Sequence, residues 1–393
     1  MSFLEINRKD PRIVQVCPLH LTAHPLAVNT IRVRIDKFGV SANNITYVAL
    51  GDSFQYSKFF PTKDTQITHQ MPVWGLATVV ESKHPRVPVS VRFFGYLPAA
   101  SHCDLNVERV DSTSFKVSRP QLPADRAVYN HYEFCTTDPL YNPATENAMI
   151  LFRPVWFTSF YLNDYVQYHK CFGASTILVS SASSKTSFCF AQLARVSDPS
   201  VRVVALTSPR NAAWVSSLGV YTDTILYDDI PTSSLLSPHS TEENNRVVYV
   251  DVAGDFALLN RVVSALGGSQ NLAKCIEVGA SHYDPANTPI ISEHGDNNHS
   301  SSDGPKINRE LFFMPSWILK RKSEVGMTVL TKDVEKGWAM MLRDSSKWIQ
   351  FREFNGNDAA KAVYLDMLEA RALPDIGYIV RMDANVFDNE SKL

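Results

Sequence analysis

A run of small hydroxyl residues with one lysine occupies positions 180–186, with the sequence Ser-Ser-Ala-Ser-Ser-Lys-Thr. It joins a short apolar segment, STILVSS, to a segment with helical spacing, SKTSFCFAQLARV. Dinucleotide-binding folds place their glycine-rich phosphate turn between such a strand and helix. No glycine is present here, but hydroxyl donors, an ammonium group and a helix N-terminus remain to bind an anion. The alternative is that the serines only cap the helix. The phosphate-binding residues predicted on this basis are Ser181, Ser183, Ser184, Lys185 and Thr186.

The end of the next buried strand indicates which nicotinamide cofactor would fit. Asp or Glu usually stands there to accept a hydrogen bond from the ribose 2'-OH, whereas this chain has Thr207, Ser208, Pro209, Arg210 and Asn211 in succession. Hydroxyls and a guanidinium group can hold a 2'-phosphate, so NADPH is the predicted cofactor. The Ser-Pro pair is also typical of a helix start, and the two interpretations are compatible. Tyr227 and Gly279, near the ends of later strands, complete the predicted cofactor-binding set.

Two different patterns position these residues along the chain. Residues 30–38 alternate apolar and polar side chains as a half-buried strand does, and 73–82 and 87–98 are also strand-like, which predicts a mostly β module over about the first 130 residues. From 175 to 281, short buried strands alternate with helical segments, which predicts a parallel sheet with right-handed crossovers. A polar loop is expected at 292–306, followed by further strands and helices up to 382. The predicted fold class is α/β.

Composition excludes several classes of protein. The 393 residues are 45% hydrophobic and carry a net charge of -2, so no global field would draw the chain to nucleic acid. No apolar run reaches the roughly 18 to 20 residues that cross a membrane, and the N-terminus is too polar for a signal peptide. The six cysteines are far apart and are expected to be free thiols, and no residue set has metal-ligand spacing. We therefore expect a soluble intracellular protein without nucleic-acid or membrane partners.

The chain ends on Ser391-Lys392-Leu393, which is the tripeptide address for peroxisomal import. The polar residues before it are typical of an accessible tail. The sequence thus predicts the peroxisomal import receptor as a partner and the peroxisome as the location, with the cytoplasm as the alternative.

Several of these motifs resemble a known family. The segments LVSSASSKTSFCFAQLA and VVALTSPRNAAWVSSLGVYTDTILYDDI resemble the medium-chain dehydrogenase/reductase superfamily. More narrowly, SSASSKT, TSPRN, VPVSVRFFGYLP, MPVWGLATVV and VGASHY resemble an uncharacterised branch known only as a domain of unknown function. The resemblance covers roughly residues 25–382. It implies a GroES-like catalytic domain built from 1–145 and 283–393, a Rossmann-like nucleotide-binding domain at 146–282, and a cleft between them.

The departures from that superfamily narrow the expected chemistry. Zinc-dependent members carry Gly-His-Glu where this chain has Val73, Trp74, Gly75 and Leu76, and the four-cysteine zinc lobe is absent. The resemblance therefore implies a metal-free protein closer to quinone and enoyl thioester reductases, in which NADPH delivers hydride to an activated C=C bond. The substrate would be a small molecule such as an acyl thioester or a secondary metabolite, and a homodimer is common for the architecture. The alternatives are a non-redox isomerase, lyase or hydrolase on the same fold, and a binding or scaffold protein.

The same resemblance places candidate proton donors in loops that would face the cleft. Tyr47 and Tyr56 lie in the segment that corresponds to the catalytic tyrosine loop of enoyl thioester reductases, and the alignment does not choose between them. A buried Tyr or His is more often structural than catalytic, so the group is predicted rather than any single member. The predicted catalytic residues are Tyr47, Tyr56, His102, Tyr132 and His282.

Overall fold

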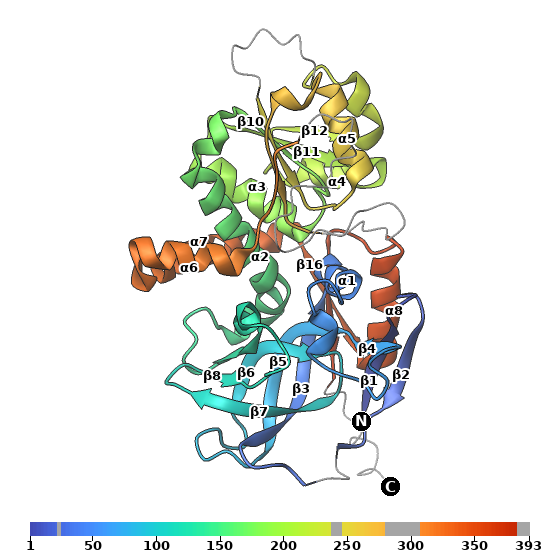
Figure 1. Cartoon of the computed structure of the whole chain (residues 1–393), viewed down its shortest axis with the longest axis vertical. Helices are drawn as coiled ribbons and strands as arrows, with labels where there is room; N and C mark the ends of the chain where they lie inside the picture. The colour runs from blue at the N-terminus through green and yellow to red at the C-terminus, as the bar shows by residue number, and fades with distance from the viewer. Residues whose placement is uncertain (22–24, 237–245, 280–306, 383–393) are drawn as a thin grey trace. The chain divides into compact units, whose positions relative to one another are not determined.

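The computed structural model describes residues 1–21, 25–236, 246–279 and 307–382. The chain divides into two compact units, which are described separately (Figure 1). Unit 1 comprises Met1–Pro154 and Ser345–Leu393, and unit 2 comprises Val155–Asp344. The predicted sites at His282 and at Ser391-Lys392-Leu393, and the loop at 292–306, lie outside the described residues.

An eight-stranded sheet forms most of unit 1, in the order β16-β17-β3-β5-β6-β9-β8-β7. Strand β3 also pairs with β7, so six of the strands close into an antiparallel barrel without free edges between them. The strands predicted at 30–38 and 73–82 are present as β3 and β5. The bounds are β3 (Thr30–Val40), β5 (Pro72–Ser82), β6 (Arg92–Pro98), β7 (His102–Val110), β8 (Ser114–Val117), β9 (His131–Phe134), β16 (Gln350–Asn355) and β17 (Ile376–Arg381).

Smaller elements surround this barrel. A three-stranded sheet has the order β2-β1-β4, and two α-helices and several 3-10 helices connect the strands. These elements are β1 (Ser2–Asn7), β2 (Val14–Pro18), β4 (Thr68–Gln70), α1 (Ala42–Ala49), α8 (Gly356–Leu368), η2 (Tyr56–Lys58), η3 (Ala124–Asn130) and η4 (Pro143–Thr145). Helix α1 begins with a capping box, in which the Asn44 side chain accepts from the backbone N–H of Ser41.

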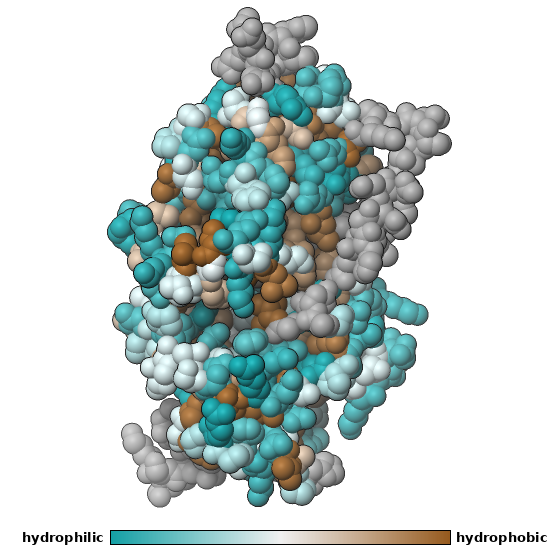
Figure 2. Space-filling view, turned by 60° about the vertical axis from the view of Figure 1, so that its left-hand side comes forward, coloured by the Kyte–Doolittle hydropathy of each residue, from teal (hydrophilic) through white to brown (hydrophobic). Residues whose placement is uncertain are grey.

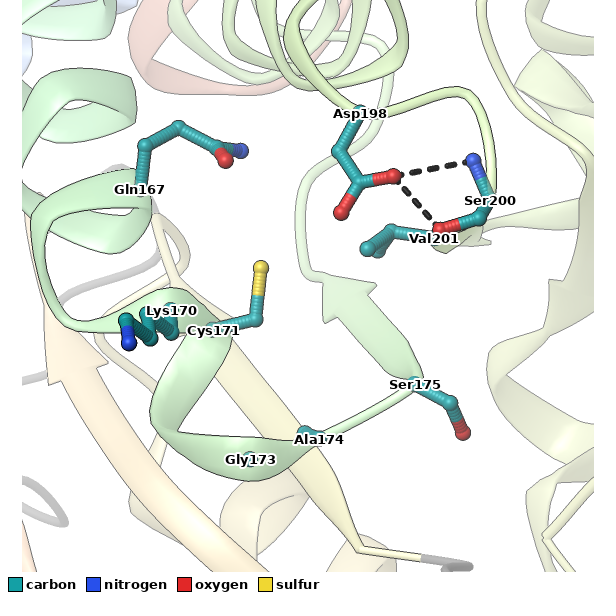
Figure 3. A pocket seen from close by; sticks show the side chains of 9 residues that line it. All are labelled: Gln167, Lys170, Cys171, Gly173, Ala174, Ser175, Asp198, Ser200 and Val201. Atoms are coloured by element: carbon teal, nitrogen blue, oxygen red, sulfur yellow. Dashed lines mark hydrogen bonds between the residues drawn. The ribbon is translucent and has the colours of Figure 1, made fainter.

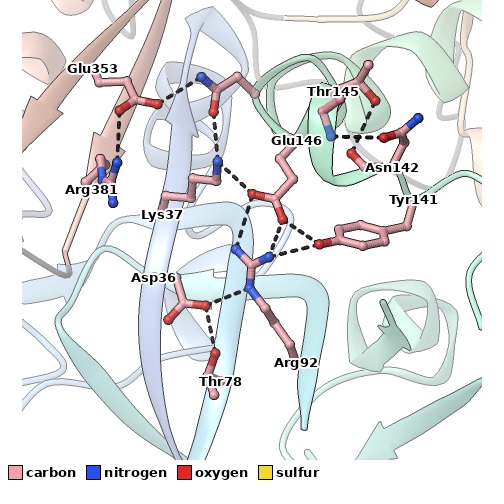
Figure 4. A network of polar contacts seen from close by, with 12 residues as sticks. Asp36, Lys37, Thr78, Arg92, Tyr141, Asn142, Thr145, Glu146, Glu353 and Arg381 are labelled. Carbon is pink, nitrogen blue, oxygen red and sulfur yellow. Dashed lines mark hydrogen bonds and ion pairs between the residues drawn. The ribbon is translucent and has the colours of Figure 1, made fainter. Parts of the chain in front are cut away.

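A buried ionic network joins the barrel to the first turn of helix α2 (Figure 4). Arg92 bonds both Asp36 and Glu146, and the Lys37 ammonium lies 2.8 Å from a Glu146 oxygen. Burial alone would raise the pKa of Glu146, but hydrogen bonds from Arg92, Lys37 and Tyr141 lower the pKa to about 2. The network therefore fixes the start of α2 on the barrel as long as this carboxylate is ionised.

Unit 2 is built on a six-stranded parallel sheet in the order β12-β11-β10-β13-β14-β15. Counted along the chain the order is 3-2-1-4-5-6, which is the order of dinucleotide-binding folds, and it reverses between β10 and β13. The carboxyl ends of these two strands therefore mark the expected ligand position. The bounds are β10 (Thr176–Val179), β11 (Arg202–Thr207), β12 (Asp223–Leu226), β13 (Val247–Asp251), β14 (Leu272–Glu277) and β15 (Arg309–Leu311).

Helices complete unit 2. The unit spans Val155–Asp344, whereas the nucleotide-binding domain was predicted at 146–282. They are α2 (Glu146–Tyr168, whose first turns belong to unit 1), α3 (Lys185–Ser197), α4 (Pro209–Ser217), α5 (Phe256–Ala265), α6 (Met314–Val325) and α7 (Met327–Trp348), with η5 (Lys170–Gly173), η6 (Tyr227–Thr232) and η7 (Ser269–Asn271). The Trp317 indole of α6 donates to Asp164 of α2 at 2.7 Å, and Trp338 of α7 packs edge-on against Trp156 of α2. Because of these contacts, α6 and most of α7 belong to unit 2.

The described surface is mixed in character. On the face shown in Figure 2, hydrophobic side chains form separate patches among hydrophilic ones. Among the described residues, no helix combines the length and the apolar character that spanning a membrane requires.

Candidate functional site

A serine and an aspartate join the two central strands of the parallel sheet where the strand order reverses. The Ser180 hydroxyl, just after β10, donates to Asp251 Oδ1 at the end of β13 over 2.9 Å. The backbone N–H groups of Val252 and Ala253 donate to the Ser180 oxygen, and those of Ala253 and Gly254 donate to Asp251. Burial raises the pKa of Asp251 to about 6 despite these bonds. The carboxyl ends of β10 and β13 are thus held together by a closed polar network.

The next residue, Ser181, adopts a backbone conformation normally left to glycine. Its φ is +46°, which lies in the left-handed region. Its N–H donates to the Tyr227 hydroxyl at 3.0 Å, and the Tyr221 hydroxyl donates to the carbonyl of Ala182 at 2.8 Å. Two tyrosines therefore hold the turn in a geometry that related turns reach with glycine.

Helix α3 begins directly after this turn. Ser184 is its N-cap and accepts from the N–H of Ser187, while the Asn211 side chain reaches from α4 and donates to the Ser183 hydroxyl at 3.0 Å. A helix N-terminus of this kind favours an anion, because its first N–H groups have no intrahelical acceptor. The structure brings together five predicted residues here, namely Ser183, Ser184, Lys185, Thr186 and Asn211.

The end of β11 matches the pattern expected for a cofactor with a 2'-phosphate. Thr207 is buried, Ser208 occupies the N-cap position of α4 without a side-chain cap bond, and Arg210 is exposed in the first helical turn. No acidic residue follows this strand before α4. The Rossmann-type features of unit 2 therefore fit a dinucleotide.

Gly279 lies just beyond β14 and is the last of the predicted cofactor residues. A Cβ atom at this position would come within 2.9 Å of the Val252 carbonyl oxygen. Glycine is therefore required for the close approach of two backbone segments at this end of the sheet.

In unit 1, four tyrosines from separate elements pack into one group, which we call the tyrosine cluster. Its members are Tyr47 of α1, Tyr56 of η2, Tyr96 of β6 and Tyr129 of η3. The contacting rings have centroids 4.8 Å apart for Tyr47 and Tyr56, and up to 6.3 Å apart for Tyr47 and Tyr129. The structure thus brings together two predicted catalytic tyrosines with two that were not in the predicted set.

Hydrogen bonding inside the tyrosine cluster is uneven. The Tyr47 oxygen accepts from the Trp74 indole at 2.8 Å and from the Asn43 side chain at 2.9 Å. The hydroxyls of Tyr56 and Tyr129 share one bond of 3.0 Å. The Tyr96 hydroxyl is fully buried and has no partner among the described residues. Burial raises the pKa of all four phenols.

Two buried arginines lie beside the cluster. Arg126 is fully buried and donates to the Phe54 carbonyl, and the Arg119 guanidinium lies over the rings of Phe59 and Phe60. Burial dominates the raised pKa of Tyr96, and the charge of Arg119 opposes that shift. The two guanidinium groups therefore place positive charge beside the phenols.

The other two predicted proton donors that the structure describes in unit 1, Tyr132 and His102, are not members of the tyrosine cluster. Tyr132 is fully buried, donates to the Tyr96 carbonyl oxygen at 2.6 Å and accepts from Arg119, so its hydroxyl is already engaged. His102 begins β7 opposite Arg34 of β3, and no hydrogen bond or ring contact joins it to the tyrosine cluster within the described residues. Burial lowers the pKa of His102. A catalytic role for either residue stays a prediction. The hydrogen bonds of Tyr132 favour a structural role for it.

Tyr96 and Tyr129 of the cluster, and Trp74 beside it, were not in the predicted set. Trp74 and Tyr96 form a cross-strand pair. They lie directly opposite each other in the β5–β6 pair, with ring centroids 5.2 Å apart. The available signal was the alternation in each strand, since Phe94 and Tyr96 share one face of β6 and Phe94 stacks on Trp74.

A separate pocket of about 410 Å³ opens at the other end of the parallel sheet, where β10 and β11 begin (Figure 3). It follows a turn in which Lys170, Cys171, Phe172 and Gly173 all have positive φ. Gln167, Asp198 and Cys171 are among its lining residues. None of the predicted site residues contributes to this pocket. Among the described residues, no group of three or more His, Cys, Asp or Glu side chains could hold a metal ion.

A family model described as "Protein of unknown function (DUF2855)" matches residues 38–372. The chain belongs to the DUF2855 family. No curated protein matches the sequence of this DUF2855 chain.

Solved structures share the fold of this DUF2855 protein at low identity. CurA from Vibrio vulnificus, in complex with NADPH, is 12% identical with a TM-score of 0.55, covering 94% of both chains. The CurK enoyl reductase is 14% identical with a TM-score of 0.53, covering 97% of this chain and 99% of its own. A quinone oxidoreductase of Pseudomonas syringae pv. Tomato DC3000 is 16% identical with a TM-score of 0.52, over 97% and 99%. The fold is that of the medium-chain quinone and enoyl reductases, so the predicted α/β class with GroES-like and Rossmann-type parts is confirmed.

Proposed function

We propose that this DUF2855 protein is an NADPH-dependent, zinc-independent reductase of an activated C=C bond or a carbonyl group. The observation that carries the proposal is the turn after β10, where Ser181 takes the left-handed backbone of a phosphate turn. The turn leads into the N-terminus of α3 at the point where the strand order reverses. A reductase of this fold is also consistent with the NADPH complex of CurA.

The residues of unit 2 would divide the work of binding. The hydroxyls of Ser183 and Thr186 and the α3 N-terminus would bind the pyrophosphate, while Thr207, Ser208 and Arg210 would bind the 2'-phosphate. Bound NADPH supplies a hydride. Lys185 adds a cation to the phosphate end, and Gly279 keeps the backbone close beside β13.

A second candidate is a non-redox enzyme that keeps the fold without the cofactor. One observation favours it: the Ser181 N–H, which could face a phosphate, donates to the Tyr227 hydroxyl instead. NADPH binding would therefore need room beside an existing bond, and absence of binding would select this alternative.

Titration of the purified protein with NADPH and NADH, followed by nicotinamide fluorescence, tests the proposal. We expect NADPH to bind more tightly, and Arg210→Ala to weaken NADPH binding about 10- to 100-fold while leaving NADH unchanged. Arg352→Ala, at an exposed arginine in β16, serves as the matched control and should bind both cofactors like the parent. Equal affinities of the parent and Arg210→Ala for NADPH would overturn the assignment of the 2'-phosphate site.

Peroxisomal delivery through Ser391-Lys392-Leu393 and formation of a homodimer stay predictions. A fluorescent protein fused to the N-terminus tests the first, because deletion of Leu393 should turn a punctate pattern diffuse.

A further inference from the structure

We propose that the pocket at the amino ends of β10 and β11 binds a small zwitterion, a molecule that carries both an ammonium group and a carboxylate group, as free amino acids do. This site is independent of the proposed cofactor, which would bind at the opposite, carboxyl end of the same parallel sheet. Three features support it: the fixed shape of the pocket, polar groups in its lining that lack partners, and the opposite charges of its two walls.

One wall of the pocket is the turn η5, which joins α2 to β10. Lys170, Cys171 and Phe172 have φ values of +50°, +49° and +52°, in the left-handed region that disfavours residues with a Cβ atom. The Phe172 N–H donates to the His169 carbonyl at 2.9 Å, and the Ala174 N–H donates to the Cys171 carbonyl at 2.8 Å. The rings of His169 and Phe172 also stack. A strained turn persists only where its surroundings fix it, so this wall has one shape.

The other wall is the loop between α3 and β11. Asp198 follows α3, and its N–H donates to the Ala194 carbonyl at 2.9 Å. Its Oδ1 atom accepts from the backbone N–H of Ser200 at 3.0 Å and from the Ser200 hydroxyl at 2.6 Å. The carboxylate is therefore held in place by its own loop. Because both walls are formed without a ligand, binding would lose little conformational entropy.

The second oxygen of Asp198 is available to a ligand. Among the described residues, no hydrogen bond to its Oδ2 atom occurs and no cation acts on the carboxylate. Hydrogen bonds from Ser200 lower the pKa of Asp198, so the group is ionised at neutral pH. An ammonium group of a ligand would form a charge-assisted hydrogen bond with this oxygen.

Gln167 supplies a donor on the side of α2. Figure 3 shows the Gln167 amide, the Cys171 thiol and the Asp198 carboxylate directed into the same space. The side-chain nitrogen of Gln167 is buried and has no partner within the described part of the chain. A buried donor without a partner costs free energy, and an oxygen of a ligand would remove that cost.

The two walls differ in charge. Lys170 stands three residues after Gln167 on the α2 side, and no ion pair of Lys170 occurs among the described residues. Burial, together with the charge of Asp198, raises the pKa of the Cys171 thiol, which therefore stays neutral. A carboxylate on the side of Lys170 and an ammonium on the side of Asp198 complement both walls. A simple amine or a simple acid complements only one.

The volume and the apolar lining fit a short aliphatic chain between the two charges. The pocket holds about 410 Å³, which lies in the range of small-molecule sites. Ala174 and Val201 are buried lining residues and offer apolar contact to methylene groups.

Three zwitterions that differ only in the number of methylene groups between their charges serve as probes: glycine, β-alanine and 4-aminobutyrate. Propylamine and propionate carry one charge each and are the comparison. Saturation-transfer NMR on the full-length protein measures the dissociation constants. We expect at least one zwitterion to bind about fivefold or more tightly than either singly charged compound, because it makes one more charge-assisted bond. Binding of no zwitterion, or equally tight binding of propylamine or propionate, would overturn the proposal.

Variants then locate the bound zwitterion. Asp198→Asn keeps an oxygen for Ser200 but removes the charge, and should weaken binding about tenfold. Gln167→Met keeps the length of the side chain without its amide and should weaken binding about threefold. Asp255→Asn makes the matched change at the N-cap of α5, where asparagine also caps, and should bind like the parent. If Asp198→Asn does not fold, Gln167→Met provides the same test. Equal affinity in the parent and in both pocket variants would overturn the site.

Discussion

The turn of unit 2 and the tyrosine cluster of unit 1 differ in how fully their polar groups are hydrogen-bonded. In the turn, Ser181, Ser183 and Ser184 each make a bond to a neighbouring residue, and Asp251 accepts several. In the cluster, Tyr96 has no partner among the described residues and Tyr47 has no described acceptor for its proton. The polar groups of the first region are paired with one another, whereas the second region keeps buried hydroxyl groups without described partners.

This difference separates two ways of preparing a site. A turn whose polar groups are paired keeps its shape without a ligand. The backbone strain at Ser181 lowers its stability. In a cluster of buried hydroxyls without partners, the groups stay available for hydrogen bonding. The missing hydrogen bonds lower the stability of the folded unit. The stability of each unit should follow this division.

Acid should destabilise the unit that carries the tyrosine cluster. His69 of β4 is buried, and neither ring nitrogen has a partner among the described residues. Burial, aided by the charge of Arg8 and opposed by that of Asp52, lowers the pKa of His69 to about 4. The unfolded chain takes up this proton below about pH 6.5, so stability present above that pH is lost between pH 6.5 and 4. The loss should reach about 3 kcal/mol.

Urea unfolding of the parent and of His69→Phe between pH 7 and 4 checks this prediction. The variant keeps an apolar ring next to Gly51 and should lose this part of the acid sensitivity. An identical slope of unfolding free energy against pH in both proteins would contradict it.

The turn of unit 2 should respond in the opposite direction over part of the same range. Burial raises the pKa of Asp251 from 3.8 to about 6, so the folded state holds a proton that the unfolded state releases. The stability it contributes is full below pH 3.8 and falls as the pH rises to 6, by about 2 to 3 kcal/mol. Asp251→Asn keeps an acceptor oxygen for Ser180 and should remove this dependence. Hydrogen exchange of β10 and β13 at pH 4 and 6.5 measures it, and an unchanged pH effect in the variant would refute the assignment.

Local segments explain why so much of the turn could be predicted. Ser181 to Thr186 and Thr207 to Asn211 each lie within one strand–turn–helix connection, and parallel sheet topology alone brings the two connections together. The left-handed φ of Ser181 could not be foreseen, because the bonds of Tyr221 and Tyr227 that surround the turn come from distant segments. The alternation of strands and helices was likewise a local signal.

Contacts distant in sequence account for what could not be predicted. The cluster depends on the register that sets Trp74 opposite Tyr96, and on α1, η2 and η3 reaching the same place. The extension of unit 2 to Asp344 depends on the pairing of Trp317 with Asp164. Periodicity indicates that a helix forms, but not which surface it will cover.

A pair of buried hydroxyls in unit 1 should show the cost of completed and missing bonds directly. Tyr132→Phe leaves an Arg119 N–H and the Tyr96 carbonyl oxygen without their partner, so it should lower the free energy of unfolding by about 2 kcal/mol. Tyr96→Phe removes a hydroxyl that has no described partner and should be neutral or stabilising by up to about 1 kcal/mol. Chemical denaturation measures the free energy of unfolding of both variants. An equal decrease in the two would contradict the difference in hydrogen-bond pairing between the two hydroxyls.

The smallest expected effect concerns the backbone of Ser181. A residue with a Cβ atom pays about 1 to 2 kcal/mol in the left-handed region, and glycine avoids this cost but loses more entropy on folding. Ser181→Ala removes the same hydroxyl while keeping the Cβ, so the difference between Ser181→Gly and Ser181→Ala isolates the backbone. We expect Ser181→Gly to be more stable than Ser181→Ala by about 1 kcal/mol, a rise of roughly 2 to 4 °C in the melting temperature of unit 2. At an ordinary φ, glycine would instead be the less stable of the two by a similar amount, so the sign of the difference decides whether the turn is held in the strained conformation without cofactor.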